Sequence, residues 1–287
     1  MKIAIAGSSG FVGSSIRDAI RKRGHKVHVI TRSELEQKPE DLRLSLGQCD
    51  WVINCAGSTR IGNAVDRRAN THLPAELYDK LHDCITDGYL HISSVAAIGS
   101  VSQPGEWITE DYVESPNSEY GHTKLEGDKR LRNLGNSGIK ICILRPPILY
   151  GAKAGGVFGI LRKCALNGLP LPFANLSNLR HFMFIDNFAG AVVAAIEAQL
   201  EGIYITVDHE PLSPARIYDL MTTIAGKGTR TFSLGPIVKP ILKLLLRSRA
   251  SSLLDDACYQ DAKFKRQTGY VPSYSMREAF EITMRPY

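Results

Sequence analysis

A tyrosine and a lysine stand four residues apart in SEYGHTKLEGD (118–128), a segment whose pattern predicts a helix. Residues at this spacing lie one above the other on an α-helix, so Tyr120 and Lys124 would point to the same side. A free phenol titrates at about pH 10, and a neighbouring ammonium favours the phenolate and moves that pKa toward neutrality. The pair could therefore exchange a proton with a substrate oxygen. Such pairs also occur by chance on surface helices, so the other motifs must decide.

Three glycines lie in the segment GSSGFVG (7–13), which leads from an expected buried strand, 2–6, into an expected helix, 11–24. Glycines at this place permit a tight turn and a close approach of the backbone to a pyrophosphate, which the helix N-terminus attracts. An ordinary strand–turn–helix is the alternative. The spacing, G-x-x-G-x-x-G, predicts a dinucleotide site formed by Gly7, Ser9, Gly10, Phe11, Val12 and Gly13.

The end of the second expected strand, 26–30, indicates which dinucleotide binds. An NAD site usually carries an acid here to bond the ribose hydroxyls, whereas this chain has Thr31 followed by Arg32. An arginine attracts a 2′-phosphate that an acid would repel. We therefore expect NADP(H) as the preferred cofactor, with NAD(H) possible if Arg32 is only a solvated loop residue.

The elements that must position these residues alternate along the first half of the chain. Further strands are expected at 50–54, 89–93 and 140–144, with helices at 63–86 and 118–135 between them. This alternation predicts an α/β fold, a Rossmann-like doubly wound parallel sheet. We expect a dinucleotide-binding domain at 1–150, to which 181–207 returns, and a smaller, discontinuous substrate lobe from 151–180 and 208–287.

Composition excludes several classes of protein. Of the 287 residues, 44% are hydrophobic and 22% charged, which argues against disorder and fibres. The N-terminus lacks the apolar segment and cleavage site of a signal peptide, and no apolar run is long enough to cross a bilayer, so we expect a cytoplasmic protein without an integral membrane segment. The six cysteines are scattered and no metal-ligand spacing occurs, which predicts reduced thiols and no metal site.

Positive charge raises two further possibilities. The 35 Lys and Arg outnumber the 29 Asp and Glu, but the excess is spread along the chain without a nucleic-acid-binding pattern, so we expect no nucleic-acid partner. The segment PIVKPILKLLLRSRA (236–250) is both apolar and basic. It fits either a helix packed on the second lobe with solvated lysines or a membrane-surface helix.

The motifs follow one another in the order of a known family. After the glycine loop come D-x-V-I-x-x-A (50–56), a serine pair five residues before a glycine (94–99) and Y-x-x-x-K (120–124). LRPP with YG (144–151) and R-x-F-x-x-I-D-N (180–187) complete the series. Over nearly its whole length the chain resembles extended short-chain dehydrogenases/reductases of the nucleotide-sugar epimerase/dehydratase family. The resemblance implies a homodimer formed through the helices at 63–86 and 118–135.

The resemblance also assigns roles to residues. It implies that Ser94 holds the substrate oxygen beside Tyr120, and that Lys124 stabilises the phenolate and bonds the nicotinamide ribose. Arg180 matches the arginine that binds the nucleotide diphosphate in the family, whereas Asn187 replaces a frequent Asp. Further cofactor contacts are expected from Asn54, Ala56, Gly57 and Pro146, with Pro147 beside the last of these.

The surroundings of Ser94 bear on the type of reaction. Dehydratases of the family have an Asp-Glu pair after the catalytic hydroxyl, whereas this chain has Val95, Ala96 and Ala97, which exchange no proton. The expected reaction is NAD(P)H-dependent reduction of the C4 ketone of a UDP- or dTDP-4-keto-6-deoxyhexose. The chain further resembles N-acetylquinovosamine-type 4-reductases of surface polysaccharide synthesis. A UDP-hexose 4-epimerase with bound NAD, or a non-catalytic NADP(H)-binding sensor or assembly factor, are the alternatives.

Overall fold

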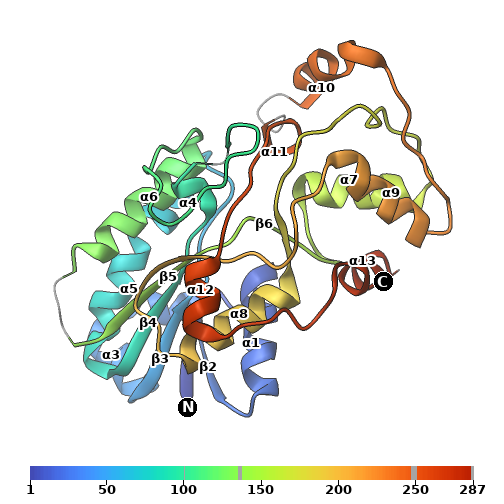
Figure 1. The fold of residues 1–287 in the computed structure, drawn as a ribbon. Helices are drawn as coiled ribbons and strands as arrows, with labels where there is room; N and C mark the ends of the chain where they lie inside the picture. Colours follow the sequence, from blue (N-terminus) through green and yellow to red (C-terminus); the bar gives the residue numbers. More distant parts are fainter. Residues whose placement is uncertain (100, 135–137, 247–250, 286–287) are drawn as a thin grey trace.

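The computed structural model describes residues 1–99, 101–134, 138–246 and 251–285 (Figure 1). Its main sheet has six parallel strands in the order β2-β1-β3-β4-β5-β8. They are β1 (Lys2–Ala6), β2 (Lys26–Ile30), β3 (Cys49–Asn54), β4 (Ile85–Ile92), β5 (Lys140–Arg145) and β8 (Gly202–Ile205). Since β2 and β3 lie on opposite sides of β1, the chain reverses its direction of winding there, which places a crevice at the carboxyl ends of β1 and β3.

Helices cover both faces of this sheet, which confirms the predicted doubly wound α/β fold. The side chains of β1 alternate, so that Ile3 and Ile5 enter one core with α1 and α8 while Ala4 enters the other with α3 and α5. The helices on the sheet are α1 (Phe11–Lys22), α3 (Pro39–Leu46), α5 (Leu73–Leu81), α6 (Glu119–Arg132) and α8 (Ile185–Glu197). The strands are apolar in nearly every position because both of their faces are buried.

The segment 63–86, expected as one helix, is broken. It forms α4 (Ala64–Thr71), α5 and the short 3-10 helix η1 (His82–Cys84), and its last two residues already belong to β4. The side chain of Asn63 caps α4 by accepting a hydrogen bond from Asp66 N at 2.9 Å. Pro74, in the first turn of α5, has no N–H to donate and therefore suits a helix start rather than a helix interior.

A second cluster of buried side chains lies beside the sheet and is built from distant parts of the chain (Figure 1). Its helices are α7 (Gly156–Leu166), α9 (Pro214–Ile224), α10 (Val238–Leu246), α11 (Ser251–Leu254) and α13 (Met276–Met284). A separate pair of parallel strands, β6 (Ile148–Tyr150) and β7 (Phe182–Phe184), connects it to the sheet. Strand β7 thus pairs with β6 and does not join the main sheet.

One helix of the C-terminal part packs on the main sheet. Helix α12 (Ala262–Thr268) contacts β8, and its Phe264 is fully buried in the same cluster as α1 and α8. The Lys263 ammonium also donates to the Ile203 carbonyl at 3.0 Å. The segment 208–287 therefore contributes to both clusters, and the division of the chain into two lobes stays a prediction.

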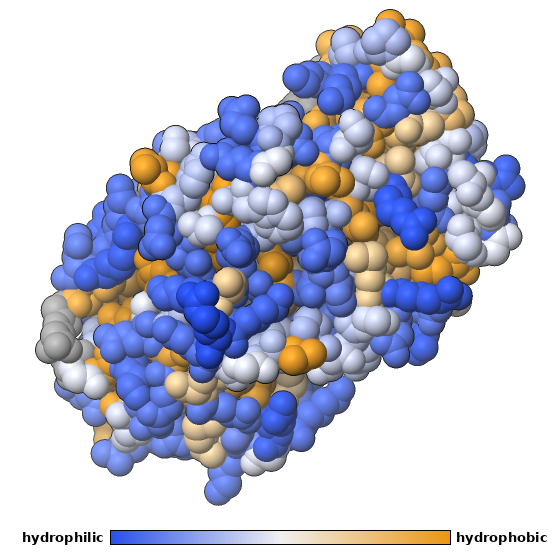
Figure 2. Space-filling view, in the orientation of Figure 1, coloured by the Kyte–Doolittle hydropathy of each residue, from blue (hydrophilic) through white to orange (hydrophobic). Residues whose placement is uncertain are grey.

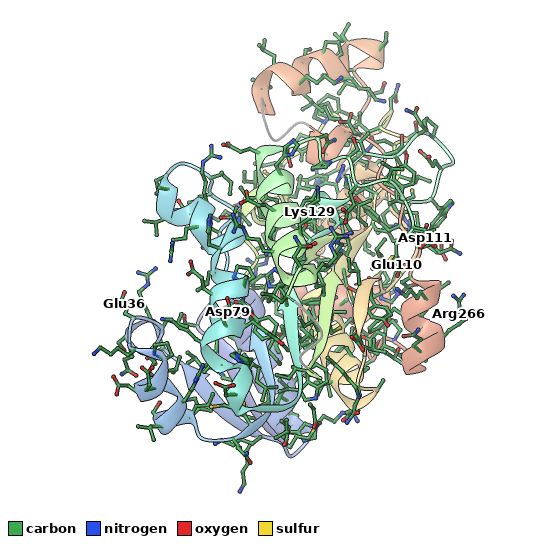
Figure 3. All side chains as sticks on the ribbon, turned by 90° about the vertical axis from the view of Figure 1, so that its left-hand side faces the viewer. Glu36, Asp79, Glu110, Asp111, Lys129 and Arg266 are labelled. Carbon is green, nitrogen blue, oxygen red and sulfur yellow. The ribbon has the colours of Figure 1, made fainter. Side chains whose placement is uncertain are left out.

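The surface helices expected to mediate dimerisation are strongly polar. Helices α5 and α6 contact each other and face the viewer in Figure 3, where Asp79 and Lys129 are labelled. Exposed residues of α6 include Glu119, His122 and Glu126. The homodimer stays a prediction.

The basic segment 236–250 is helical where the structure describes it. The 3-10 helix η3 (Gly235–Ile237) leads into α10, and residues 247–250 lie outside the described residues. Among the helices of the described part of the chain, none is long and apolar enough to cross a bilayer.

Candidate active site

The glycine loop connects β1 to α1 and has the geometry of a phosphate-binding turn. Gly7 has a φ of +77°, and a Cβ there would lie 2.6 Å from Ala56 N. A Cβ on Gly13 would lie 2.2 Å from the Gly7 carbonyl oxygen, so helix α1 approaches the turn closely only without a side chain. The first and third glycines are therefore required by the fold itself.

Gly10 differs from the other two because the protein alone does not require it. A Cβ there would meet only the Gly7 oxygen, at 3.5 Å, an ordinary contact. Gly10 is exposed at the N-cap of α1, beside the exposed Ser9, while Phe11 and Val12 pack against the clusters below. The space over Gly10, with the N–H groups of the first helical turn pointing into it, fits a pyrophosphate.

The end of β2 holds an acid that the sequence prediction missed. Thr31 caps the short helix α2 (Arg32–Leu35), and its hydroxyl donates to Glu34 Oε2 at 2.6 Å. The Thr31 N–H donates to the same oxygen at 2.7 Å, and these two bonds lower the pKa of Glu34. The side chain of Thr31 is thus engaged in the cap. The spacing of a capping box, T-x-x-E, was the signal that could have revealed this acid.

Arg32 is exposed and lines a hollow of about 640 Å³ between α2, α4 and α5. Arg68 and Lys80 line it as well, together with the apolar side chains of Leu35 and Val65. Arg68 forms an ion pair with Glu76 at 2.7 Å, and Lys80 Nζ donates to the Leu35 carbonyl at 2.5 Å. The hollow combines cations with an apolar wall beside the end of β2.

The loop after β3 lies between the glycine turn and α6. Asn54 is fully buried, its Oδ1 accepts from Ala56 N at 2.9 Å, and its Nδ2 lies 3.3 Å from His91 Nδ1. A Cβ on Gly57 would lie 3.5 Å from Lys124 Nζ, so this loop reaches the expected catalytic lysine. The buried side chain of Asn54 therefore fixes the backbone of this loop through Ala56, whereas Gly57 is exposed to solvent.

Tyr120 and Ser94 lie within hydrogen-bond reach of each other, the placement that the family resemblance implied. Ser118 is the N-cap of α6, its hydroxyl accepts from Gly121 N at 3.1 Å, and this cap places Tyr120 in the first turn. Ser94 follows β4 and starts the 3-10 helix η2 (Val95–Ala97). Burial raises the pKa of Tyr120 to about 12, although a hydrogen bond with Ser94 acts in the opposite direction. The phenol is therefore protonated at neutral pH in the protein without ligands.

Lys124 lies one turn further along α6 and is buried, with 4% of its surface exposed. Its Nζ donates to the carbonyl of Ile92, the last residue of β4, at 2.8 Å. Desolvation lowers the pKa of Lys124 to about 8, and the Asp128 carboxylate partly opposes this shift. The lysine is a buried ammonium between the Ile92 carbonyl and the Gly57 loop.

The same stripe of α6 continues to Asp128, which the sequence prediction missed. Its Oδ2 accepts from Ser93 Oγ at 2.9 Å and from the Arg145 guanidinium at 2.9 Å, and both residues are buried. Arg145 also donates to Glu114 at 2.6 Å. Asp128 thus connects α6 to the ends of β4 and β5, next to Ser94 and Pro146. The signal was the spacing of 120, 124 and 128, which repeats every four residues.

The remaining predicted residues lie in segments other than β4 and α6. Pro146 is buried, and its carbonyl accepts from Val95 N at 3.0 Å, which holds the chain after β5 against the turn that bears Ser94. Arg180 is buried in another segment, where its Nε donates to the Asp255 carbonyl at 3.3 Å. Asn187, also buried, bonds Asp208 Oδ2 at 3.0 Å and the Tyr274 carbonyl at 2.9 Å. It therefore has a structural contact inside the protein.

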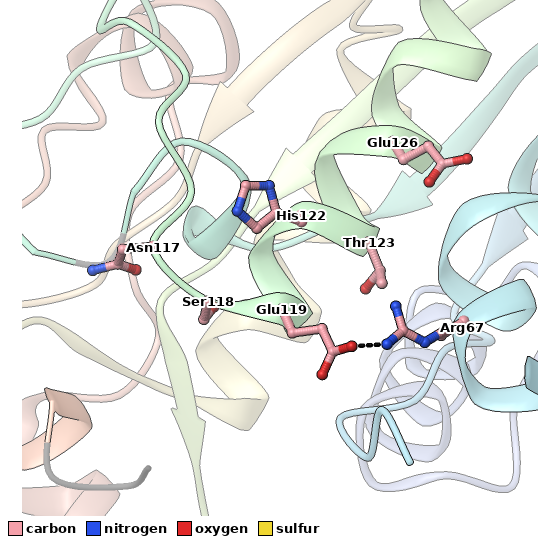
Figure 4. A pocket seen from close by; sticks show the side chains of 7 residues that line it. All are labelled: Arg67, Asn117, Ser118, Glu119, His122, Thr123 and Glu126. Atoms are coloured by element: carbon pink, nitrogen blue, oxygen red, sulfur yellow. Dashed lines mark ion pairs between the residues drawn. The ribbon is translucent and has the colours of Figure 1, made fainter. Parts of the chain in front are cut away.

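Another hollow, of about 430 Å³, lies on the outer side of α6 (Figure 4). An ion pair between Arg67 and Glu119 crosses it, and His122 and Glu126 form part of its wall. Tyr120 and Lys124 do not line it. It is a polar surface feature apart from the stripe of Tyr120, Lys124 and Asp128.

A comparison with protein families decides the affiliation. The model described as "NAD dependent epimerase/dehydratase family" matches residues 3–205, well over half of the chain. The chain belongs to this family. The prediction of an extended short-chain dehydrogenase/reductase and of an NAD(P)-dependent enzyme is thereby confirmed.

Individual relatives of this family member are distant. A UDP-glucose 4-epimerase of Vibrio cholerae is 24% identical over 99% of this chain and 95% of its own. A dTDP-4-dehydrorhamnose reductase of Mycolicibacterium smegmatis is 31% identical over 45% of this chain and 40% of its own. The crystal structure of the human epimerase family protein SDR39U1 with NADPH superimposes with a TM-score of 0.78, at 19% identity and 99% coverage of both chains. Such similarity establishes the fold and leaves the substrate open.

Proposed function

We propose that this protein is an NADPH-dependent 4-ketoreductase acting on a UDP- or dTDP-4-keto-6-deoxyhexose, of the N-acetylquinovosamine type, in surface polysaccharide synthesis. The observation that carries the proposal is that, among the described residues, Tyr120 lies beside Ser94 as a proton donor while no carboxyl group follows Ser94 in η2. Tyr120 shares a hydrogen bond with Ser94, and the residues after Ser94 in η2 are apolar and buried. Eliminating water across two carbons needs a further acid and base, whereas reducing a ketone needs one proton donor.

The residues of this chain would divide the work as follows. NADPH, when held in this site, would supply the hydride for reduction of the C4 ketone. Tyr120 donates its phenolic proton to the developing alkoxide, and Ser94 donates a hydrogen bond to the same oxygen. Lys124, held by the Ile92 carbonyl, stabilises the phenolate that remains.

The proposed cofactor site uses the crevice at the ends of β1 and β3. The turn at Gly7, Gly10 and Gly13 accommodates the pyrophosphate, and Arg32 would bond the 2′-phosphate of NADP(H). The Glu34 carboxylate, bonded to Thr31, lies close to this arginine in sequence and would weaken the attraction. NAD(H) therefore stays an alternative cofactor.

The sugar nucleotide is assigned to the segments after β5. Arg180 would bind its diphosphate, which requires the guanidinium to leave the Asp255 carbonyl or to bond the ligand with its other nitrogens. We also expect a cytoplasmic homodimer.

The test is the absorbance at 340 nm of purified protein with a UDP-4-keto-6-deoxy-N-acetylhexosamine, with NADPH and NADH in parallel. Stoichiometric loss of NADPH is the expected result. Product analysis by NMR must show an equivalent 4-hydroxy sugar. The absence of both NADPH and NADH oxidation would overturn the reductase proposal.

A 4-epimerase is the second candidate because the Vibrio cholerae relative of that name covers nearly the whole chain. An epimerase would interconvert UDP-hexoses on tightly bound NAD, with no net oxidation of added cofactor. A non-catalytic sensor or assembly factor would do neither, although the presence of Ser94, Tyr120 and Lys124 together disfavours it. The same reaction, repeated with UDP-glucose and followed by NMR of the sugar products as well as by absorbance, separates the three.

Replacing Arg32 by Ala is expected to weaken NADPH binding about tenfold and to leave NADH binding within about twofold, because one charge-assisted bond to phosphate is lost. The measurement is the dissociation constant of each cofactor by fluorescence titration. The control, Glu34→Gln, removes the nearby negative charge and should tighten NADPH binding. An Arg32→Ala variant that loses both cofactors equally would contradict the phosphate role.

The pH dependence should reflect Lys124. Its pKa of about 8 lies below the ordinary value, so the ammonium is present at lower pH and is lost as the pH rises through about 8. We therefore expect kcat/KM for NADPH, which reports groups of the free enzyme, to decline above that pH. A profile that stays level up to pH 10 would contradict a need for the protonated lysine.

A further inference from the structure

One stretch of the chain combines positive charge with a complete lack of acids. Between Asp219 and Asp255 there is no Asp or Glu. The same stretch contains six cations: Lys227, Arg230, Lys239, Lys243, Arg247 and Arg249. The last two lie outside the described residues. The stretch is therefore a segment of one sign of charge, as is the longer acid-free stretch 129–185.

Helix α10, in the middle of this stretch, is only half packed. Val238 and Leu242 are buried in the second cluster, with 2% and 9% of their surface exposed. Leu244 and Leu245, by contrast, are 78% and 71% exposed, and Ile241 is 40% exposed. Residues 241, 244 and 245 share one face of the helix because they are three and four positions apart.

Further exposed apolar side chains precede the helix in the sequence. Phe232, Leu234 and Ile237 are each at least 40% exposed and lie in the segment that leads into α10. Figure 1 places α10 at the end of the molecule, and Figure 2 shows hydrophobic surface gathered there. The α10 patch, as we call residues 232, 234, 237, 241, 244 and 245 together, is thus a protruding apolar surface.

Cations lie on another side of the same helix. Lys239 and Lys243 are exposed and one turn apart, so they share a side of α10 that, at 3.6 residues per turn, is opposite Ile241, Leu244 and Leu245. Lysine stems can lie along apolar surface while the ammonium reaches toward a polar boundary. Apolar side chains on one face and lysines on the other are the pattern of helices that lie in a membrane interface.

We propose that the α10 patch binds the surface of an anionic lipid bilayer, with Ile241, Leu244 and Leu245 entering the headgroup boundary. A symmetric contact with a second copy is disfavoured because it would bring the same cations of both copies together without any acid of this stretch to pair them. Anionic headgroups instead attract the lysines, and the acyl boundary takes up the leucines. The proposal does not rest on the proposed catalytic function.

The test uses the full chain in co-sedimentation with vesicles of phosphatidylcholine alone and of phosphatidylcholine mixed with phosphatidylglycerol. We expect binding to the mixed vesicles, at least about tenfold weaker binding to the neutral ones, and weakening by salt. The double variant Leu244→Asp/Leu245→Asp should abolish binding, and Lys239→Gln/Lys243→Gln should reduce it about tenfold. Both pairs are exposed, so folding, followed by circular dichroism, should be retained.

Leu44→Asp is the matched control, since Leu44 is 83% exposed on α3, away from the α10 patch. It should bind mixed vesicles as the unchanged protein does. Three results would each overturn the proposal: no binding to mixed vesicles, equal binding to neutral vesicles, or a dimer in solution that the Leu244→Asp/Leu245→Asp variant dissociates.

Discussion

Replacing Tyr120 by Phe should lower kcat about a thousandfold, because the substitution removes only the hydroxyl that donates the proton. The ring remains in the first turn of α6, and Lys124 keeps its bond to the Ile92 carbonyl. Cofactor binding should therefore change by less than about twofold. The measurement combines steady-state reduction of the keto-sugar with a fluorescence titration of NADPH.

A matched control is Tyr204→Phe. The Tyr204 hydroxyl, on the edge strand β8, donates to the Glu201 carbonyl at 2.7 Å and to the side chain of Gln267 in α12. Its removal should cost about 1 kcal/mol of stability and leave kcat unchanged. If Tyr120→Phe kept its turnover, Tyr120 could not be the proton donor.

The second large effect is expected on stability, from Asp128→Ala. The variant leaves the Arg145 guanidinium, with 1% of its surface exposed, without one of its two carboxylate partners. Removing one partner of a buried ion pair costs about 3–5 kcal/mol of stability. Because Arg145 keeps Glu114 as a partner, we expect the free energy of unfolding to fall by about 3 kcal/mol. The measurement is the free energy of unfolding in urea.

Glu126→Ala is the control for this prediction, since Glu126 lies on the same helix and pairs with Arg130 in an exposed i,i+4 contact. Its loss should cost less than about 0.5 kcal/mol. Equal effects of the two variants would show that the buried pair contributes no more than a surface pair.

Asp128→Asn adds a readout that a purely structural role would not change. The Asp128 carboxylate raises the pKa values of both Lys124 and Tyr120, so its neutralisation should lower both. The decline of kcat/KM on the alkaline side should then move to lower pH. An unshifted profile would limit Asp128 to a structural role.

The sequence predicted the parts of the site that depend on local spacing. The strand before Gly7, the cap at Ser118 and the four-residue step from Tyr120 to Lys124 are encoded within a few residues, and the structure places them as expected. The contact between Ser94 and Tyr120 joins two elements, and only the resemblance to a family could suggest it.

The parts that were missed depend on tertiary contacts. In the sequence, Asp128 is one of several charged residues of a polar helix. It is buried because the folded chain packs Ser93 and Arg145 against it, and these contacts cannot be inferred from the helix alone. Phe264 likewise looks like a residue of the C-terminal lobe until α12 folds back onto β8. The pattern of apolar residues within a segment shows which face of a helix or strand is buried. It does not show which other element packs against that face.

The second cluster has a consequence for the order of events during synthesis. Arg162 of α7 donates to the carbonyl of Thr283, 121 residues away, and α9 and α13 pack in the same cluster. Because translation delivers the chain from its N-terminus, β1, β3, β4 and β5 can pair while this cluster still lacks α13. Phe158 therefore lacks its contact with Phe280, and Phe184 its contact with Tyr274, until the segment with α13 emerges, and this incomplete cluster is a surface that a chaperone would meet on the nascent chain.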